Sequence, residues 1–496
     1  MHIYPHLETE NMDNSTSGSE TIQPPKNTKF QNIAIAAVVV ISLIAILSPG
    51  FLPVNSVLLA ISLMIAMCLL RLPVPVALIS GALVGGLNSG LDIHDTIGAI
   101  NDNLAEGAQV GITYVMIGAF AVALARSGLL DMLANKMSGA VAKGVNSSLL
   151  KWGLFSIFIL ASVMSQNVVP VHIAFIPVMI PPLLTIFNHL KIDRRAVACI
   201  IACSISVSYL LLPTGFGAIY LFEILLPNLN SAGADYGLAV EASQVPAAMF
   251  LPVMGIIAGM LVAVFITYRK PREYDDELTN KMVFHSEAPN LNLKQLVFVI
   301  AAIAVALVCQ IEFDSLLVGA MIGFILLSFS GIFTWQQQDD VFTEGMRMMV
   351  QIAVIITIAA GFAGVLSATG EIPSLVEATK SLIGDNKAIG ALLMLLVGLF
   401  ITIGFGDSFA SVPILAPIYV PLALSLGFSP AATIALLGAS AALGDAGSPA
   451  STISLGVTSG LNADGQHDHI RDSVIPTFTH ANLGMVLFAW IAALIL

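Results

Sequence analysis

Two aspartates stand at small-residue interruptions of one apolar stretch, residues 404–461. Asp407 lies within Gly-Phe-Gly-Asp-Ser at 404–408, and Asp445 lies within Gly-Asp-Ala-Gly-Ser-Pro at 444–449. Glycine loosens a helix and proline removes a backbone donor, so helices should end at both places. Within hydrocarbon, the freed backbone groups must be satisfied by protein, water or a bound ion. The two breaks therefore predict one polar site built from interrupted helices.

The two carboxylates suggest cation chemistry. A charged side chain at the bilayer centre costs about 2.5–3.5 kcal/mol on insertion scales, so it normally faces a cavity or a partner. A buried carboxyl favours its protonated form until a cation compensates the charge, which allows exchange of a proton for an alkali ion. We predict that Asp407 and Asp445 couple to protons and hold Na⁺. Oxygens nearby could complete the site, at Gly406, Ser408, Ser411, Gly444, Ser448, Ser451 and Thr452. The alternative is that these residues only cap half-helices.

The composition is that of a membrane protein. The chain has 496 residues, of which 57% are hydrophobic and 10% charged, and its mean hydropathy is +0.91. A soluble domain carries about 25% charged residues. The net charge of −12 with few Lys and Arg argues against nucleic acid as a partner. Residues 1–30 are polar and predicted to be a disordered tail, cytoplasmic because Lys26 and Lys29 precede the first span.

Apolar length and loop charge predict the topology. We expect an all-α polytopic protein with about eleven crossings plus two re-entrant hairpins. The hairpins are 151–188, with its tip at Asn167, and 389–424, with its tip at Asp407. Broken helices are expected at 196–226 and 431–460. The expected simple spans are 31–48, 52–70, 73–88, 108–125, 246–268, 295–310, 316–333, 346–366 and 477–496. Lys380 and Lys387 fall on the side that this scheme assigns to the outside.

The two halves of the chain repeat. Pro177 and Pro181 recur as Pro417 and Pro421 at an offset of 240 residues, which also lays Asn167 on Asp407. An odd number of crossings separates equivalent elements, so the second copy is expected to be inverted. The predicted parts are a tail (1–30), extra spans (31–72), repeat 1 (73–268), a cytoplasmic linker (269–294), and an extra span with repeat 2 (295–496).

Inverted repeats with interrupted helices indicate a secondary transporter whose site lies at the repeat interface. The first copy offers uncharged candidates for substrate or ion binding at the matching places, namely Ser165, Gln166, Asn167, Thr214 and Gly215. His172 follows the first tip and is a candidate proton carrier or substrate contact, or else a structural histidine. The breaks of copy two carry acids, whereas those of copy one carry uncharged polar residues. We therefore expect copy two to handle the ion and copy one to supply neutral hydrogen bonds, which favours an organic substrate.

Other classes of protein remain as alternatives. A channel is compatible with paired half-helices. Residues 404–407 match the GxGD pattern of intramembrane aspartyl proteases, but the only Tyr-Asp pair, Tyr274-Asp275, lies in the charged linker. We therefore expect no enzyme and no cofactor other than Na⁺ or H⁺ as the coupling ion. The Gln-His-Asp-His tract at 466–469 resembles a metal tract, and we interpret it as a solvated turn.

The combined motifs resemble the NhaC-type Na⁺/H⁺ antiporter family of the ion-transporter superfamily, in its YuiF-like branch of suspected amino-acid permeases, including for histidine. The resemblance rests on residues 165–167 with 170–177, on 193–198, on 444–451, and on 458–462 with 464–470. It implies hairpin-plus-broken-helix repeats, a homodimer, and a multi-pass protein of the cell inner membrane. Thr452 stands where the family commonly has an Asp. The expected function is cation-coupled transport of a small amino acid such as histidine, with exchange of inorganic Na⁺ and H⁺ only as the alternative.

Overall fold

The computed structural model describes residues 53–129, 147–167, 179–281 and 291–496, apart from residues 71, 314 and 385, together with the single residues 40, 132 and 176. All regular structure in these ranges is helical. They contain nine helices that are long and apolar enough to cross a membrane and three shorter apolar helices. The expected all-helical, multi-span membrane protein is confirmed at this level.

The elements of the first half are α2 (Ser56–Leu69), α3 (Val74–Asn88), α4 (Ile93–Arg126), α6 (Ser147–Asn167), η1 (Pro181–Leu183), α8 (Leu184–His189), α9 (Arg194–Leu211), α10 (Phe216–Ala218), η2 (Ile219–Leu225), α11 (Leu226–Gly233), η3 (Ala234–Tyr236), α12 (Gln244–Val262) and η4 (Ala263–Thr267). The later elements are α13 (Asp276–Lys281), α14 (Leu293–Phe313), α15 (Leu316–Phe329), α16 (Trp335–Ala368), α17 (Ile372–Ile383), α18 (Lys387–Phe405), α19 (Ser408–Ser425), α20 (Pro430–Gly447), α21 (Thr452–Leu461), η5 (His469–Val474), α22 (Ile475–Thr477), η6 (Phe478–Asn482) and α23 (Leu483–Ile495).

One group of helices, which we call the frame, comprises α2, α3, α4, α14, α15 and α16. Its centre is the antiparallel pair of α4 and α16. A methyl group on Gly118 would lie 2.4 Å from the Gly345 oxygen, and one on Gly107 would lie 2.7 Å from the Thr357 Cα. Without a hydrophobic drive between helices in lipid, such small residues allow the close backbone contact that holds membrane helices together.

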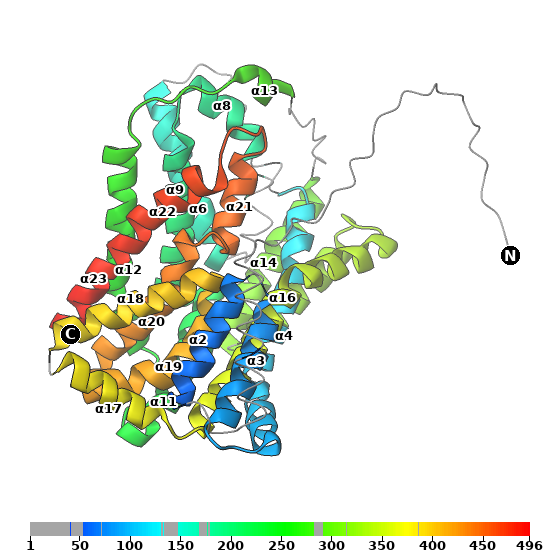
Figure 1. Cartoon of the computed structure of the whole chain (residues 1–496). Helices are drawn as coiled ribbons and strands as arrows, with labels where there is room; N and C mark the ends of the chain where they lie inside the picture. Colours follow the sequence, from blue (N-terminus) through cyan, green and yellow to red (C-terminus); the bar gives the residue numbers. More distant parts are fainter. Residues whose placement is uncertain are drawn as a thin grey trace, which may run out of the picture.

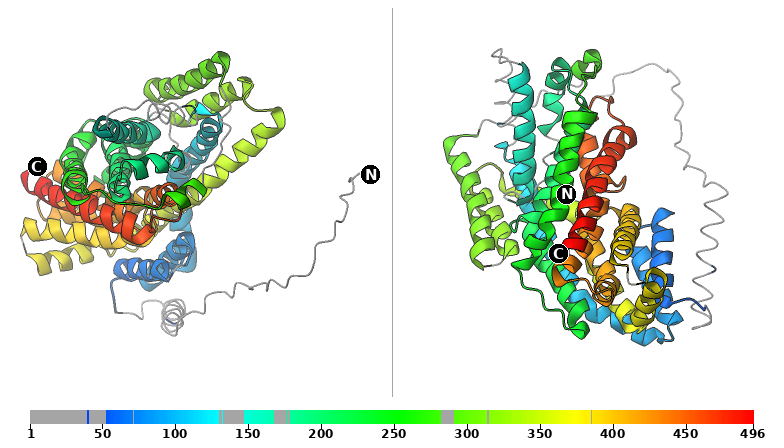
Figure 2. Two further views of the ribbon diagram at one scale, coloured as in Figure 1. Left: turned by 90° about the horizontal axis from the view of Figure 1, so that it is seen from above. Right: turned by 90° about the vertical axis from the view of Figure 1, so that its left-hand side faces the viewer.

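The second group, the broken-helix group, comprises α6, α9 to α12 and α18 to α23, which pack on one another. Figure 1 and the left-hand view of Figure 2 show the frame along one side of the molecule and the broken-helix group with the C-terminus on the other. In the space-filling view α18 (yellow) and α23 (red) lie side by side on one face, and these helices are in contact. The two groups meet where α16 packs against α19.

The helices α4 and α16 are longer than the predicted spans at 108–125 and 346–366. Each has 34 residues, about 51 Å of helix, whereas a hydrocarbon core is about 30 Å thick. Their starts are set by caps. The Asp92 side chain accepts from the Asp95 amide at 2.7 Å, and Thr334 forms a capping box with Gln337. Hydropathy marks only the apolar part of such helices. The acidic segment around residues 95–106, which lies outside the predicted spans, is therefore found to be the first part of α4.

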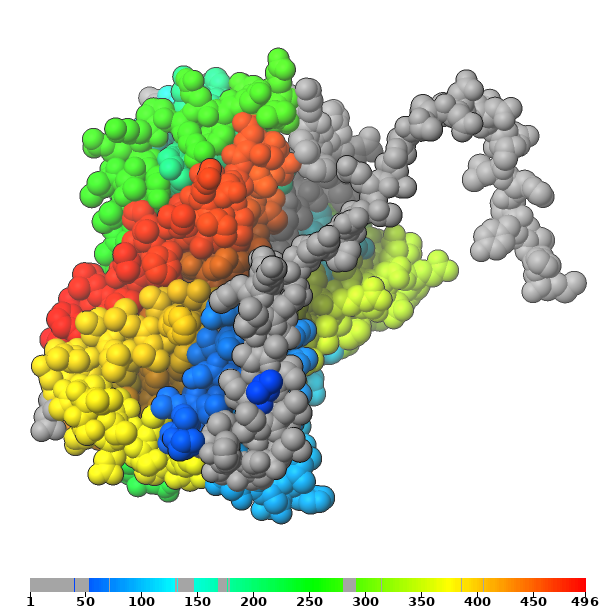
Figure 3. Space-filling view, in the orientation of Figure 1, coloured from blue at the N-terminus to red at the C-terminus, as the bar shows by residue number. Residues whose placement is uncertain are grey.

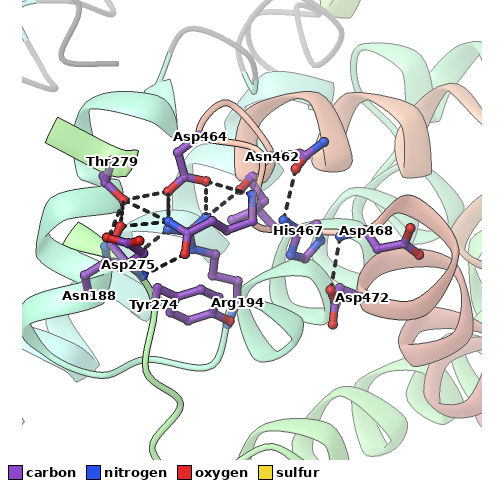
Figure 4. Close-up of polar contacts among 12 residues, drawn as sticks. Asn188, Arg194, Tyr274, Asp275, Thr279, Asn462, Asp464, His467, Asp468 and Asp472 are labelled. Atoms are coloured by element: carbon purple, nitrogen blue, oxygen red, sulfur yellow. Dashed lines mark hydrogen bonds and ion pairs between the residues drawn. The ribbon is translucent and has the colours of Figure 1, made fainter. Parts of the chain in front are cut away.

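A buried ion pair joins the two halves of the chain on the face that carries the linker. Arg194 donates to both carboxylate oxygens of Asp464 at 2.6 Å, and both side chains are 0% exposed. Arg194 also donates to the Leu461 carbonyl at 3.0 Å and to Asn188 at 3.0 Å, while Thr279 of the linker donates to Asp464 at 2.7 Å. Figure 4 shows these side chains converging. The start of α9, the end of α21 and the linker are therefore fastened together.

The tract at 466–469 is a solvated turn only in part: Asp468 is exposed and Gln466 and His469 are half-buried, whereas His467 is only 1% exposed. Its backbone nitrogen donates to the Asn462 side chain at 3.0 Å, and its Nε2 lies 2.8 Å from the Ser473 hydroxyl. The loop folds back against the Arg194–Asp464 pair. The local sequence does not predict this burial, because it depends on residues that are distant in the chain. Among the described residues, no cluster of three or more His, Cys, Asp or Glu could hold a metal ion.

Acidification should destabilise this face. Burial lowers the pKa of His467 to about 4 from 6.5, so between these pH values the unfolded chain binds a proton that the folded chain does not. The free energy of unfolding should therefore fall as the pH drops, by on the order of 3 kcal/mol near pH 4. Burial tends to raise the pKa of Asp464, but hydrogen bonds from Arg194 and Thr279 outweigh it and lower this pKa, which adds a loss at still lower pH.

Thermal unfolding in detergent between pH 8 and pH 4.5 measures this effect. His467→Gln cannot titrate, and it should flatten the pH dependence relative to the wild type. An unchanged dependence in His467→Gln would contradict the assignment.

Candidate functional site

The helix breaks predicted around Asp407 and Asp445 are present. Helix α18 ends at Phe405, and Gly406 has a φ of 62°, in the left-handed region that favours glycine. Asp407 then caps α19, its side chain accepting from the Ala410 amide at 2.9 Å. Helix α20 ends at Gly447, and α21 begins only at Thr452. The sequence pattern is thus confirmed as two interruptions of helix.

The two breaks touch each other. A methyl group on Gly406 would lie 2.6 Å from the Ser451 nitrogen. Ser408 donates to Asp445 twice, from its backbone nitrogen at 3.1 Å and from its hydroxyl at 2.7 Å. The Ser448 hydroxyl donates to the Ile403 carbonyl at 2.9 Å. Side chains of each break thereby satisfy groups of the other, as burial in hydrocarbon demands.

The break between α9 and α10 meets the end of α6. Gly215 has a φ of 59°, and a methyl group on it would lie 2.2 Å from the Gln166 carbonyl oxygen and 2.7 Å from the Asn167 Cα. Its backbone is held by Gln310 of α14, which accepts from the Gly215 nitrogen at 2.7 Å and donates to its carbonyl at 3.2 Å. The sequence analysis missed Gln310, a polar residue in an otherwise apolar span.

Replacing Gly215 by Ala should disrupt this break. With a φ of 59° and a ψ of −134°, Gly215 has a backbone conformation that costs a non-glycine residue about 1–3 kcal/mol, and the clash with Gln166 adds to that cost. We expect a lower thermal midpoint and loss of transport. The matched control is Gly370→Ala, because Gly370 also has a positive φ, 67°, but nothing lies within 4 Å of an added methyl group. Equal midpoints for the two variants would show that the close approach does not matter.

A small cavity of about 30 Å³ lies where the breaks and the frame meet. It brings together four of the predicted site residues, Gln166, Asp407, Asp445 and Thr452. The remaining lining residues are Tyr114, Tyr209, Phe216, Met349, Ile352, Phe409 and Ile453. No Lys, Arg or His is among these lining residues, so the described wall of the cavity has two acids without a basic counterpart.

Of the two acids, Asp445 accepts more side-chain hydrogen bonds from other helices. Besides the two hydrogen bonds from Ser408, it accepts one from the hydroxyl of Tyr209 on α9, so both halves of the chain contact it. Asp407 uses one carboxylate oxygen for the cap of α19. Three donors can stabilise a charged Asp445, and a cation between the two acids would compensate both charges.

Of the other predicted site residues, none that the structure describes is among the lining residues of this cavity. Most serve the backbone of the breaks, where Ser165, Ser411 and Ser451 donate to the carbonyls of Ser162, Asp407 and Asp445 respectively. Ser448 acts likewise, and Gly444 packs on Thr402. Asn167 donates to the Val163 carbonyl at 3.1 Å, and Thr214 lies in the α9–α10 break. His172 lies outside the described residues.

Aromatic rings surround the site, and sequence reasoning missed them. Phe409 lies 5.2 Å from Tyr114, 5.6 Å from Tyr209 and 5.4 Å from Tyr220 between ring centroids. Phe216 lies 5.0 Å from Tyr114. Tyrosines at apolar positions of predicted spans were the available signal, because a buried phenol usually needs a hydrogen-bond partner.

A larger cavity of about 450 Å³, which we call the vestibule, is lined by other residues of the same helices. Its wall includes Glu106 and Glu223 but no Lys, Arg or His among the described lining residues. Val110 and Pro413 of this wall lie one helical turn from Tyr114 and Phe409. The vestibule and the small cavity therefore lie about one helical turn apart along α4 and α19.

Interrupted helices that meet around buried carboxylates, in an all-helical multi-pass membrane protein, define the class of secondary transporters. Comparison with known proteins agrees. Residues 199–491 match the Na⁺/H⁺ antiporter family, and residues 55–141 match a second model described as the Na⁺-H⁺ antiporter family. The chain belongs to the Na⁺/H⁺ antiporter family.

Three relatives are similar over most of this chain. A membrane protein of Vibrio parahaemolyticus is 47% identical over 89% of this chain and 100% of its own length. A membrane protein of Haemophilus influenzae is 47% identical over 89% of this chain and 99% of its own. The Bacillus subtilis protein named "Putative amino acid transporter YuiF" is 45% identical over 89% of this chain and 100% of its own.

Two solved structures share the fold. The YdaH transporter of Alcanivorax borkumensis, whose topology is unusual, has a TM-score of 0.51 at 16% identity and covers 81% of this chain and 88% of its own. MtrF of Neisseria gonorrhoeae, from a class of antimetabolite efflux pumps, has a TM-score of 0.54 at 15% identity and covers 81% and 85%. At such identities the likeness concerns the fold alone.

Proposed function

We propose that this protein moves a small amino acid such as histidine in exchange or together with a cation, Na⁺ or H⁺, that binds between Asp407 and Asp445. The observation that carries the proposal is the small cavity, in which both acids line one space between interrupted helices. The relative named as an amino acid transporter supports the organic substrate. Exchange of inorganic ions alone is the second candidate, which the family supports.

The sizes of the two cavities suggest separate tasks. The small cavity, about 30 Å³, has room for one dehydrated ion or one water. Small-molecule sites are usually of about 300–1,000 Å³, and the vestibule of about 450 Å³ falls in that range. Of these two cavities, the small one therefore fits the ion at the acids, and the vestibule fits an amino acid. We infer that the substrate reaches the acids when the aromatic rings separate.

The repeat supports an alternating-access mechanism. Helices α4 and α16 have the same length and run antiparallel, and α9 and α20 each have 18 residues before a break. These pairs fit the two inverted repeats at 73–268 and 295–496, with two hairpins among about eleven crossings. The homodimer and the inner membrane with a cytoplasmic N-terminus belong to the same proposal.

The exceptions to the charge rule have a local explanation. Lys380 donates to the Ser425 carbonyl at 2.9 Å, and Lys387 donates to the Gly427 carbonyl. Both cations therefore sit at the end of α19, where positive charge is favourable. The helix terminus accounts for these two lysines on the side predicted to be outside, so they do not argue against the predicted orientation.

Purified protein in proteoliposomes tests the proposal. Labelled histidine and other amino acids are assayed for counterflow, and a pH-sensitive dye reports proton movement on addition of Na⁺. Uptake against a gradient that is lost when the Na⁺ or H⁺ gradient is collapsed supports coupled transport. Flux only down the gradient would indicate a channel, and proton movement without amino-acid counterflow would favour the inorganic antiporter. No flux of any kind would refute both candidates.

A further inference from the structure

Tyr114 of α4 is a buried phenol whose oxygen has no hydrogen-bond partner among the described residues. The side chain is 3% exposed and lines the small cavity together with Asp407 and Asp445. Other buried tyrosines are satisfied, since Tyr220 donates to the Gly438 carbonyl at 2.8 Å and Tyr419 to the Met394 carbonyl at 2.6 Å. A buried hydroxyl without a protein partner calls for an explanation, and in a cavity with two acids a water or an ion can supply the missing interaction.

We propose that the Tyr114 oxygen is a ligand of the coupling cation, and that the frame contributes this ligand in only one of the two access states. The inference rests on the proposed function and adds a residue and a role to it. A neutral phenol offers lone pairs, and hard cations take such oxygen ligands beside carboxylates. The cavity is of the right size for an ion held by Asp407, Asp445 and this oxygen.

The position of Tyr114 in the fold distinguishes it from the other ligands. Of the three lining residues that α4 and α16 provide, Met349 and Ile352 are apolar, and only Tyr114 carries a polar group. Asp407, Asp445 and the Tyr209 hydroxyl belong to the broken-helix group, and Tyr209 is bonded to Asp445. If the broken-helix group moves against the frame, those groups travel together and Tyr114 stays behind.

This separation would give the two states different affinities for the ion. A ligand shifts a conformational equilibrium only by its differential affinity for the two states. With the Tyr114 oxygen in place, the vestibule-facing state binds the cation more tightly than the opposite state. Tyr114 would thus act as a conformation-specific ligand, which Tyr209 cannot be.

Tyr114→Phe tests the inference, because it removes only the hydroxyl and keeps the ring contacts with Phe216 and Phe409. The half-saturating Na⁺ concentration for coupled flux is measured from each side in right-side-out and inside-out membrane vesicles. We expect an increase of about tenfold on the vestibule side and less than twofold on the other side. Tyr419→Phe, which also removes a buried hydroxyl but lies outside the cavity, should change neither value.

The outcomes separate the two proposals. A wild type without any Na⁺ response overturns the sodium site and the inference with it, while amino-acid counterflow by the same protein leaves the proposed transport with H⁺ standing. A wild type that responds, with Tyr114→Phe unchanged or weakened equally from both sides, overturns the inference alone. If Tyr114→Phe lacks the wild-type thermal midpoint, Tyr114→Gln decides, because it restores an oxygen. A vestibule-side value within about threefold of the wild type then supports the inference, and a larger increase overturns it.

Discussion

Coupled flux should fall about 10- to 100-fold when Asp407 is replaced by Asn. The substitution removes the charge but not the helix cap, because an amide oxygen can accept from the Ala410 nitrogen as the carboxylate does. A charged interaction contributes about 1.5–3 kcal/mol, and losing this free energy of cation binding corresponds to the expected decrease in flux. Asp445→Asn should have at least the same effect, because this side chain also faces Tyr209 and Ser408.

The measurement is initial-rate transport in proteoliposomes at matched protein density, with thermal midpoints checked in detergent. Asp468→Asn is the matched control, because Asp468 is also a helix cap, accepting from the Arg471 nitrogen at 2.7 Å, and does not line the small cavity. It should retain wild-type flux. Wild-type flux in both Asp407→Asn and Asp445→Asn would remove these residues from the coupling site.

The largest loss of stability should follow Arg194→Ala. The substitution leaves the Asp464 carboxylate buried without its bidentate partner, and breaking such a pair costs about 3–5 kcal/mol. It also removes donors to the Leu461 carbonyl and to Asn188. Since Arg194 joins α9 to the end of α21, we expect a strongly lowered thermal midpoint and poor recovery of folded protein.

Lys191→Ala provides the control on the same face. Lys191 and Glu273 also form an ion pair at 2.6 Å, but their side chains are 55% and 80% exposed. Exposed pairs contribute about 0–1 kcal/mol, so the thermal midpoint should hardly change. Replacing both buried partners, as Arg194→Met with Asp464→Leu, should recover much of the loss because no uncompensated charge remains. Similar midpoints for Arg194→Ala and Lys191→Ala would contradict this account.

Local chemistry in the sequence determined the interruptions of the helices. Gly406 with Asp407, and residues 448–451, stop a helix through backbone freedom, a missing donor and a capping side chain, all of which act within a few residues. Apolar length likewise predicted the membrane spans, although the caps at Asp92 and Thr334 extend two of them beyond the hydrophobic part.

Only the tertiary structure decided which groups meet. Tyr209 and Asp445 are 236 residues apart, and Gln310 and the Arg194–Asp464 pair reach their partners across helices. Tyr114 likewise comes from a distant helix to line the same cavity as the two acids. No periodicity or spacing encodes such contacts, because they depend on how whole helices pack. The sequence by itself therefore determined that acids would stand at breaks in the membrane. The packing of the frame against the broken-helix group decided what surrounds them, since burial and hydrogen bonding are properties of the assembled helices.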